Sequence, residues 1–171
     1  MKKLTFVTSS ERLARSLAEK YAVPIYLHAE PTMTDGKAIY LNNDYAMGEI
    51  MDYKIQQYFE GILDHEIAHL IFTYKKEHSR LEQDLLKTYN DSFMKLVINL
   101  LEDVRVNYRM SEKYLGSRTN IEFALEYFLS KEFIPYYFKG ESDLKVSALY
   151  YIFSASHLKF VRKNMNMKKV Y

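Results

Sequence analysis

The sequence contains no cysteine and no tryptophan, and only three prolines and five glycines among its 171 residues. Without cysteine, the chain can form neither disulfide bonds nor cysteine-ligated zinc or iron–sulfur sites. Any metal ion must therefore be bound by nitrogen and oxygen ligands from His, Asp or Glu. No linker rich in Gly, Ser or Pro divides the chain, and no internal repeat is present. The length then predicts a single domain over residues 1–171.

Long apolar runs are also missing. No window of 18 uncharged residues occurs, which argues against a transmembrane helix and a membrane partner. The apolar run near the N-terminus is interrupted by Glu11 and Arg12 and is too short for a secretory signal. Together with the absence of cysteine, this predicts a cytoplasmic protein.

A strong excess of charge of either sign is absent as well. The formal net charge is +2, which does not favour a nucleic-acid partner. The charge is uneven, because residues 159–171 hold five basic side chains and no acidic one. We expect this segment to be a solvated basic C-terminal tail. The alternative is a docking segment for an acidic partner or RNA.

The pattern of apolar residues predicts an α+β, mostly α fold with a small N-terminal β-hairpin. The strands are expected over 25–29 and 38–42, with a turn at Asp35–Gly36 between them. Gly61 is a possible helix break, and a loop is expected over 114–117. The helices are expected over 10–21, 49–76, 80–90, 92–112, 119–131 and 142–162.

One motif carries specific chemistry. His65-Glu66-Ile67-Ala68-His69 is an H-E-x-x-H sequence within a predicted helix. Residues i and i+4 lie on one helix face, so two imidazoles there can bind one Zn²⁺. Glu66, beside the first histidine, can accept a proton from a water molecule activated by the metal. The motif predicts zinc bound by His65 and His69, with Glu66 as the general base.

A third protein ligand is expected from a later helix. The metzincin extension is absent, because Phe72 and Lys75 stand where it requires Gly and His. The adjacent acids Glu102 and Asp103 are the alternatives. Glu102 shares a polar face with Arg105 and Arg109 that we expect to be solvated, opposite Leu100, Leu101 and Val104. Asp103 lies at the border of the apolar face that these three residues form. This position favours Asp103 as the third ligand, without excluding Glu102, whose side chain is longer.

Further residues are expected to support these ligands. Asn99 and Asn107 flank Asp103 on its helix face, and Asp64 precedes the first histidine. All three are candidates to hydrogen-bond the metal ligands and orient them. Residues 39–41 are a candidate edge strand for aligning an extended substrate. The candidates for stabilising an oxyanion are Tyr74, Tyr108, Tyr150 and Arg105.

Three segments in order resemble a known family. They are Thr34-Asp35-Gly36-Lys37-x-Ile39-Tyr40-Leu41, Gly61-x-x-Asp64-His65-Glu66-x-Ala68-His69-x-x-Phe72-Thr73 and Asn99-x-x-Glu102-Asp103-x-Arg105. They resemble the N-terminal metallopeptidase-like region of VWA-associated proteins, which include phage-encoded proteins similar to a cobaltochelatase subunit. The resemblance implies a gluzincin-like zincin domain, with the two histidines and one acid of the later helix as metal ligands. The chain departs from the family because it has no D-x-S-x-S motif, and 171 residues leave no room for a VWA domain.

Two functions follow from these features. The first is a zinc metallopeptidase acting on a peptide or protein substrate, in the host cytoplasm if it is phage-encoded. The second is a catalytically silent zinc-binding module of a phage or mobile element that interacts with a protein partner. Retention of Glu66 favours the first, because a purely structural zinc site needs no general base.

Overall fold

The computed structural model describes residues 9, 12–14, 16–17, 23–28, 32–42, 52–73, 80, 83–84 and 92–128. Within these ranges the chain is mostly helical with one small sheet, which confirms the predicted α+β, mostly α class. The residues described between 9 and 17 are helical, as predicted. The helix predicted over 142–162, the tail over 159–171 and most of the helix over 80–90 lie outside the described residues. None of the described helices is long and apolar enough to cross a membrane.

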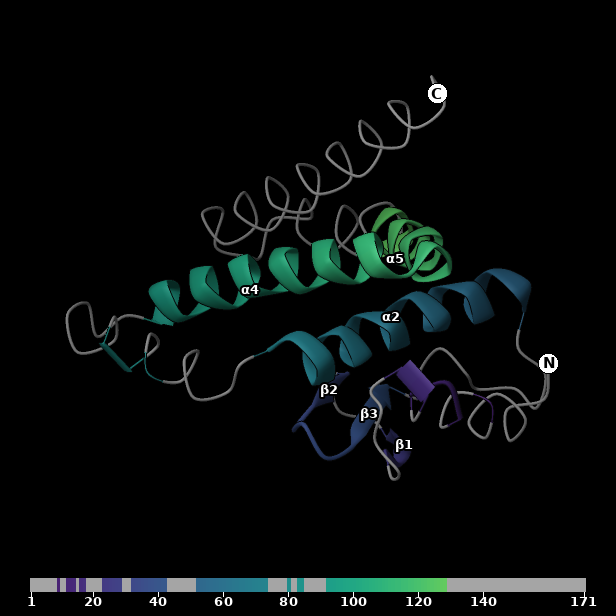
Figure 1. The fold of residues 1–171 in the computed structure, drawn as a ribbon, viewed down its shortest axis with the longest axis horizontal. Helices are drawn as coiled ribbons and strands as arrows, with labels where there is room; N and C mark the ends of the chain where they lie inside the picture. The colour runs from purple at the N-terminus through teal and green to yellow at the C-terminus, as the bar shows by residue number, and fades with distance from the viewer. Residues whose placement is uncertain are drawn as a thin grey trace, which may run out of the picture.

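The sheet has three strands in the order β1-β3-β2 (Figure 1). They are β1 (Ile25–His28), β2 (Met33–Thr34) and β3 (Ile39–Asn42). The predicted hairpin between the first and last of these is wrong, because β1 and β3 run parallel. The antiparallel partner of β3 is the short β2, and the turn at Asp35–Gly36 joins these two. Asp35 Oδ1 accepts hydrogen bonds from the backbone N–H groups of Lys37 and Ala38, and Gly36 has a φ of 80°.

The helix that carries the H-E-x-x-H motif is α2 (Tyr53–Phe72), shorter at both ends than predicted. It begins after Asp52, whose side chain accepts a hydrogen bond from the backbone of Lys54 at 2.8 Å. It ends at Thr73, where the backbone becomes extended. Gly61 does not break α2. It lies inside the helix, where the absence of a Cβ lets α5 approach closely.

Further along the described part of the chain lie α4 (Ser92–Lys113) and α5 (Leu115–Tyr127). Only Tyr114 separates them, so the loop predicted over 114–117 is wrong beyond this residue. Its extended backbone, with φ −129° and ψ 106°, is enough to break the helical path. As a result α5 begins four residues before the predicted start at 119.

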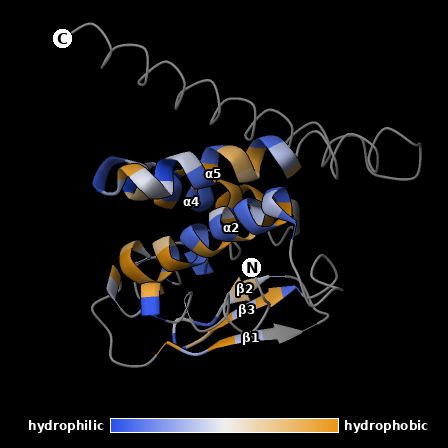
Figure 2. Cartoon of the chain, turned by 90° about the vertical axis from the view of Figure 1, so that its right-hand side faces the viewer, coloured by the Kyte–Doolittle hydropathy of each residue, from blue (hydrophilic) through white to orange (hydrophobic). Residues whose placement is uncertain are grey.

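Helix α2 lies between the sheet on one side and α4 and α5 on the other (Figures 1 and 2). Its large apolar side chains therefore contact both layers and join them into one core. The fully buried members include Ile39 and Leu41 of β3, Phe59, Leu63 and Ile67 of α2, Val106 and Met110 of α4, and Ile121 of α5. The buried polar side chains of this central helix, Asp64 and Glu66, lose water on folding, which is costly unless a hydrogen bond or a ligand compensates.

Candidate metal centre

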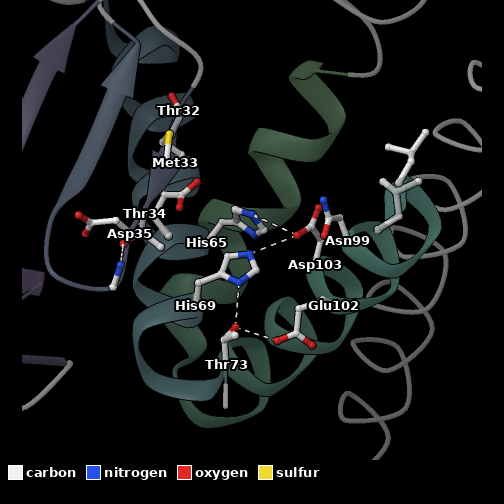
Figure 3. Close-up of a pocket in the computed structure, with 14 residues that line it drawn as sticks. Thr32, Met33, Thr34, Asp35, His65, His69, Thr73, Asn99, Glu102 and Asp103 are labelled. Carbon is white, nitrogen blue, oxygen red and sulfur yellow. Dashed lines mark hydrogen bonds and ion pairs between the residues drawn. The ribbon is translucent and has the colours of Figure 1, made fainter. Parts of the chain in front are cut away.

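The two histidines of the motif lie together on the face of α2 that meets α4 (Figure 3). Their rings contact edge to face, with centroids 4.7 Å apart. This follows from their spacing of four residues, because one helical turn brings their side chains side by side. Both rings are partly buried, with side chains 24% and 19% exposed for His65 and His69.

Asp103 of α4 completes a group of three possible ligands. Its Oδ1 lies 3.2 Å from Nε2 of His69 and 3.9 Å from Nε2 of His65. One ligand atom from each residue lies within 4.8 Å of the others, so this group could hold a metal ion. Two imidazoles and a carboxylate form a donor set that divalent transition metals such as zinc accept. The residues present therefore fit a metal ion.

A hydrogen bond orients the ring of His65. Its Nδ1 lies 2.8 Å from Oδ1 of Asn107, a buried residue of α4. An amide oxygen only accepts hydrogen bonds, so Nδ1 of His65 donates and carries the hydrogen. Its Nε2 then faces Asp103, 3.9 Å from Oδ1. The sequence predicts a supporting role for Asn107, and the structure places its amide oxygen against the ring of His65.

The ring of His69 is oriented by a different group. Its Nδ1 lies 2.9 Å from the hydroxyl of Thr73, and that hydroxyl donates to Oε1 of Glu102 at 2.7 Å. Thr73 is not among the site residues predicted from the sequence. A signal was present, because residues 65, 69 and 73 form a polar series at a spacing of four.

Glu102 is held away from the ligand group by other partners. Its two carboxylate oxygens accept hydrogen bonds from Nε and Nη2 of Arg105, each at 2.7 Å. The expectation that Glu102 lies in a solvated row is wrong, since its side chain is only 12% exposed. Leu101, expected on the buried side, is instead 52% exposed. The helix is therefore rotated so that Glu102 and Asp103 both reach the pocket, with different partners.

Glu66 is buried in the wall of the same pocket. Burial raises its pKa above the ordinary value, although the two neighbouring histidines act to lower it. For His65, burial lowers the pKa, but Asp103, Glu66 and the hydrogen bond to Asn107 together raise it above the ordinary value. The protonation of His65 and of Glu66 therefore depends on the charge of the other and on that of Asp103.

The pocket has a volume of about 430 Å³, within the range of small-molecule and peptide side-chain sites. One wall is formed by β2 and the turn after it, opposite α2 and α4 (Figure 3). Its lining residues are Thr32, Met33, Thr34, Asp35, Gly36, His65, Glu66, His69, Thr73, Leu96, Asn99, Leu100, Glu102 and Asp103. An extended ligand could therefore lie between the edge of the sheet and the histidines.

Some predicted residues lie elsewhere. Asp64 is buried on another side of α2, where it accepts a hydrogen bond from Asn120 of α5 at 2.9 Å. Asn99 lines the pocket beside Asp103 but is exposed. The hydroxyl of Tyr108 is exposed and donates to Glu112.

Other expectations concern substrate contacts. Arg105 pairs with Glu102 and is not among the residues that line the pocket. Residues 39–41 form the central strand, which is paired on both sides, so they cannot be the edge strand expected from the sequence. The edge strand at the pocket is β2. Tyr74 and Tyr150 lie outside the described residues.

Comparison with known proteins gave no match to a family model, a curated protein or a solved structure. The functional argument therefore depends on the geometry of the site.

Proposed function

We propose that this chain is a zinc-dependent metallopeptidase of the zincin type, with His65, His69 and Asp103 as the metal ligands. The observation that carries the proposal is the convergence of these three side chains beside the buried carboxylate of Glu66. A structural zinc site usually has four protein ligands, whereas catalytic sites keep three and leave one position open. Three ligands and an adjacent base support hydrolysis.

Bound Zn²⁺ would supply Lewis acidity, which polarises a carbonyl and acidifies water. Glu66 accepts the proton of the attacking water and delivers it to the leaving amine. Its burial supports this role, since a raised pKa brings a carboxylate closer to the range in which it can both take and return a proton. We place the substrate along β2, which can pair with an extended peptide backbone.

The first experiment measures the metal. Purified protein should contain about one zinc per chain by elemental analysis, and His65→Ala and His69→Ala should each lose most of it. His157→Ala is the matched control, because it removes a histidine outside the motif, and it should retain zinc. Iron in place of zinc would contradict the metal assigned here. Full zinc retention in both motif variants would contradict the site itself.

The second experiment separates the two acids of α4. Asp103→Ala removes a direct ligand, so its zinc affinity should fall by more than the 10- to 100-fold that is typical of losing a supporting residue. The loss of zinc affinity in Glu102→Ala should stay within 10- to 100-fold. The reverse order would assign Glu102 as the third ligand.

The third experiment tests catalysis. Glu66→Gln should retain zinc and lose cleavage of a peptide library by roughly 10²- to 10⁴-fold, the contribution of a general base. Glu60→Gln is the control, because Glu60 lies on the same helix and accepts a hydrogen bond from Gln56, away from the pocket lining. Zinc binding without any cleavage in the wild-type protein would instead favour the silent zinc-binding module.

A further inference from the structure

The side of α4 that carries Asp103 extends beyond the proposed metal ligands (Figure 3). Four residues of this side line the pocket, namely Leu96, Asn99, Leu100 and Asp103. Their spacing of i, i+3, i+4 and i+7 places them on one side of the helix. At a rise of about 1.5 Å per residue, this side extends about 10 Å from Asp103 to Leu96. The pocket therefore continues along α4 for about two helical turns.

The part of the pocket away from the metal ligands is rich in apolar side chains. Leu100 is 6% exposed, and Leu96 is partly buried. Met33 of β2 lines the same pocket, with 50% of its surface exposed. None of the described residues that line the pocket is a lysine or an arginine. This part of the pocket therefore favours an apolar side chain over an acidic one.

The two leucines are spaced like side chains of an extended peptide. Leu96 and Leu100 are four residues apart on one helix, which is about 6 Å along its axis. In an extended chain the side chains of residues i and i+2 point to the same side, about 6.6 Å apart. Two alternate residues of an extended ligand can therefore each contact one leucine. The side chain between them points away from α4.

Asn99 lies between the two leucines in the sequence and offers a polar contact. Its side chain is exposed and lines the pocket. An amide side chain both donates and accepts hydrogen bonds, as a peptide group does. Asn99 can therefore bond the backbone of an extended ligand, whatever side chains that ligand carries.

We propose that this side of α4 selects peptides with apolar side chains at two alternate positions, which contact Leu96 and Leu100 while Asn99 bonds the backbone. The inference names the substrate class of the proposed metallopeptidase and so rests on that function. Leu96 is the residue that determines specificity, because it lies farthest from the metal ligands and contacts only the second apolar side chain. Leu100 contacts the apolar side chain nearer the metal ligands.

Peptide binding to the Glu66→Gln protein tests this selection without cleavage. The probes are capped serine hexapeptides that contain two leucines, which are adjacent, separated by one residue or separated by two. The peptide with one intervening residue should bind about 10-fold tighter than either of the others, since one buried apolar group contributes roughly this factor. Isothermal titration calorimetry measures the three affinities.

Variants in the same background assign the contacts. Leu96→Ala removes one apolar contact, so the three peptides should bind within about threefold of one another. If Leu96→Ala does not fold, Leu96→Gln keeps the volume and should give the same result. Leu101→Ala is the matched control, because Leu101 is 52% exposed on the same helix and does not line the pocket, and it should keep the full preference. Asn99→Ala should weaken all three peptides alike, by roughly 2- to 10-fold.

The outcomes distinguish the selection from the proposed function. Equal affinity for the three peptides, or an unchanged preference in a folded Leu96→Ala protein, would overturn the selection. Cleavage of all three peptides at equal rates by the wild type would also overturn it, and would leave the metallopeptidase in place. The expected preference in a protein whose wild-type form cleaves none of the peptides would support the selection and overturn the metallopeptidase.

Discussion

At the scale of single residues, Asp64 and His65 are neighbours in the chain with different surroundings. His65 contacts α4, whereas Asp64 is 1% exposed and contacts Asn120 of α5. Burial raises the pKa of Asp64 to about 6, against hydrogen bonds from Asn120 and Ser117 that lower it. In the folded protein this carboxyl group therefore binds its proton more tightly than in the unfolded chain, where the pKa is near 3.8.

The sign of the effect on stability follows from this difference. Below pH 3.8 Asp64 is neutral in both states and costs nothing. Between pH 3.8 and about 6 the unfolded chain releases this proton while the folded protein retains it, so stability falls. For a shift of roughly two units the loss reaches about 3 kcal/mol and stays constant above pH 6. We predict that Asp64→Asn removes this cost. In metal-free protein, its free energy of unfolding relative to the wild type should rise by about 2 kcal/mol between pH 4 and pH 7.5.

Urea unfolding at a series of pH values in the presence of a chelator measures this difference. Other titrating groups affect both proteins alike, so the difference between the two curves isolates Asp64. If the free energies of unfolding of the two proteins differed by the same amount at every pH, Asp64 would not be buried as a charged group.

The residues of the site differ in how far the sequence could predict them. The shared face of His65 and His69 follows from helical spacing alone. The choice between Glu102 and Asp103 depends on how α4 is rotated against α2, and adjacent residues on a helix differ by about 100° in direction. That rotation is set by long-range packing, which no local pattern contains. The role of Thr73 depends on both the end of α2 and the position of Glu102.

At the scale of elements, the contact between α2 and α5 depends on Gly61. An added Cβ there would lie 2.2 Å from the backbone oxygen of Asn120 and 2.5 Å from Cβ of Ala124. Neither atom can move without moving α5 itself. We predict that Gly61→Ala destabilises the fold by about 3 kcal/mol or more, at or above the upper end of overpacking costs. Chemical denaturation followed by circular dichroism measures the loss.

Gly116 provides the matched control. It is also a helical glycine, but an added Cβ there meets no atom within 4 Å. Gly116→Ala should therefore be neutral or stabilising by up to about 1 kcal/mol, as helix propensity predicts. Equal stability of the two alanine variants would show that α5 does not cross α2 at Gly61.

The sheet shows that local sequence patterns can locate strands without predicting how they pair. The strand segments were located correctly because apolar residues such as Ile25 and Ile39 stand beside turn signals. Their pairing was wrong because strand propensity is the same for parallel and antiparallel partners. The two-residue β2 is too short to produce a recognisable period. Its insertion changes the edge of the sheet, and with it the strand that faces the pocket.

At the scale of the whole molecule, the proposed ligands come from two helices that are far apart in the sequence. His65 and His69 belong to α2 and Asp103 to α4, 34 residues beyond His69. The unfolded chain does not hold these three groups together, so a metal ion binds the folded state preferentially. We predict that zinc at 1,000 times its dissociation constant raises the free energy of unfolding by about 4 kcal/mol. For a chain of this size, that corresponds to an increase in Tm of about 10 °C.

The effect of removing Asp103 on the zinc-induced increase in Tm tests whether the metal joins α2 and α4. Of the three proposed ligands, Asp103→Ala retains the two histidines, which lie four residues apart on α2. Zinc should then bind weakly and shift Tm by a small fraction of the wild-type increase in thermal scans with and without metal. Glu126→Ala, which removes a carboxylate from an exposed position of α5, should keep the full shift. An undiminished shift in Asp103→Ala would mean that zinc stabilises the protein through other groups, and that the bridge between α2 and α4 is not the metal centre.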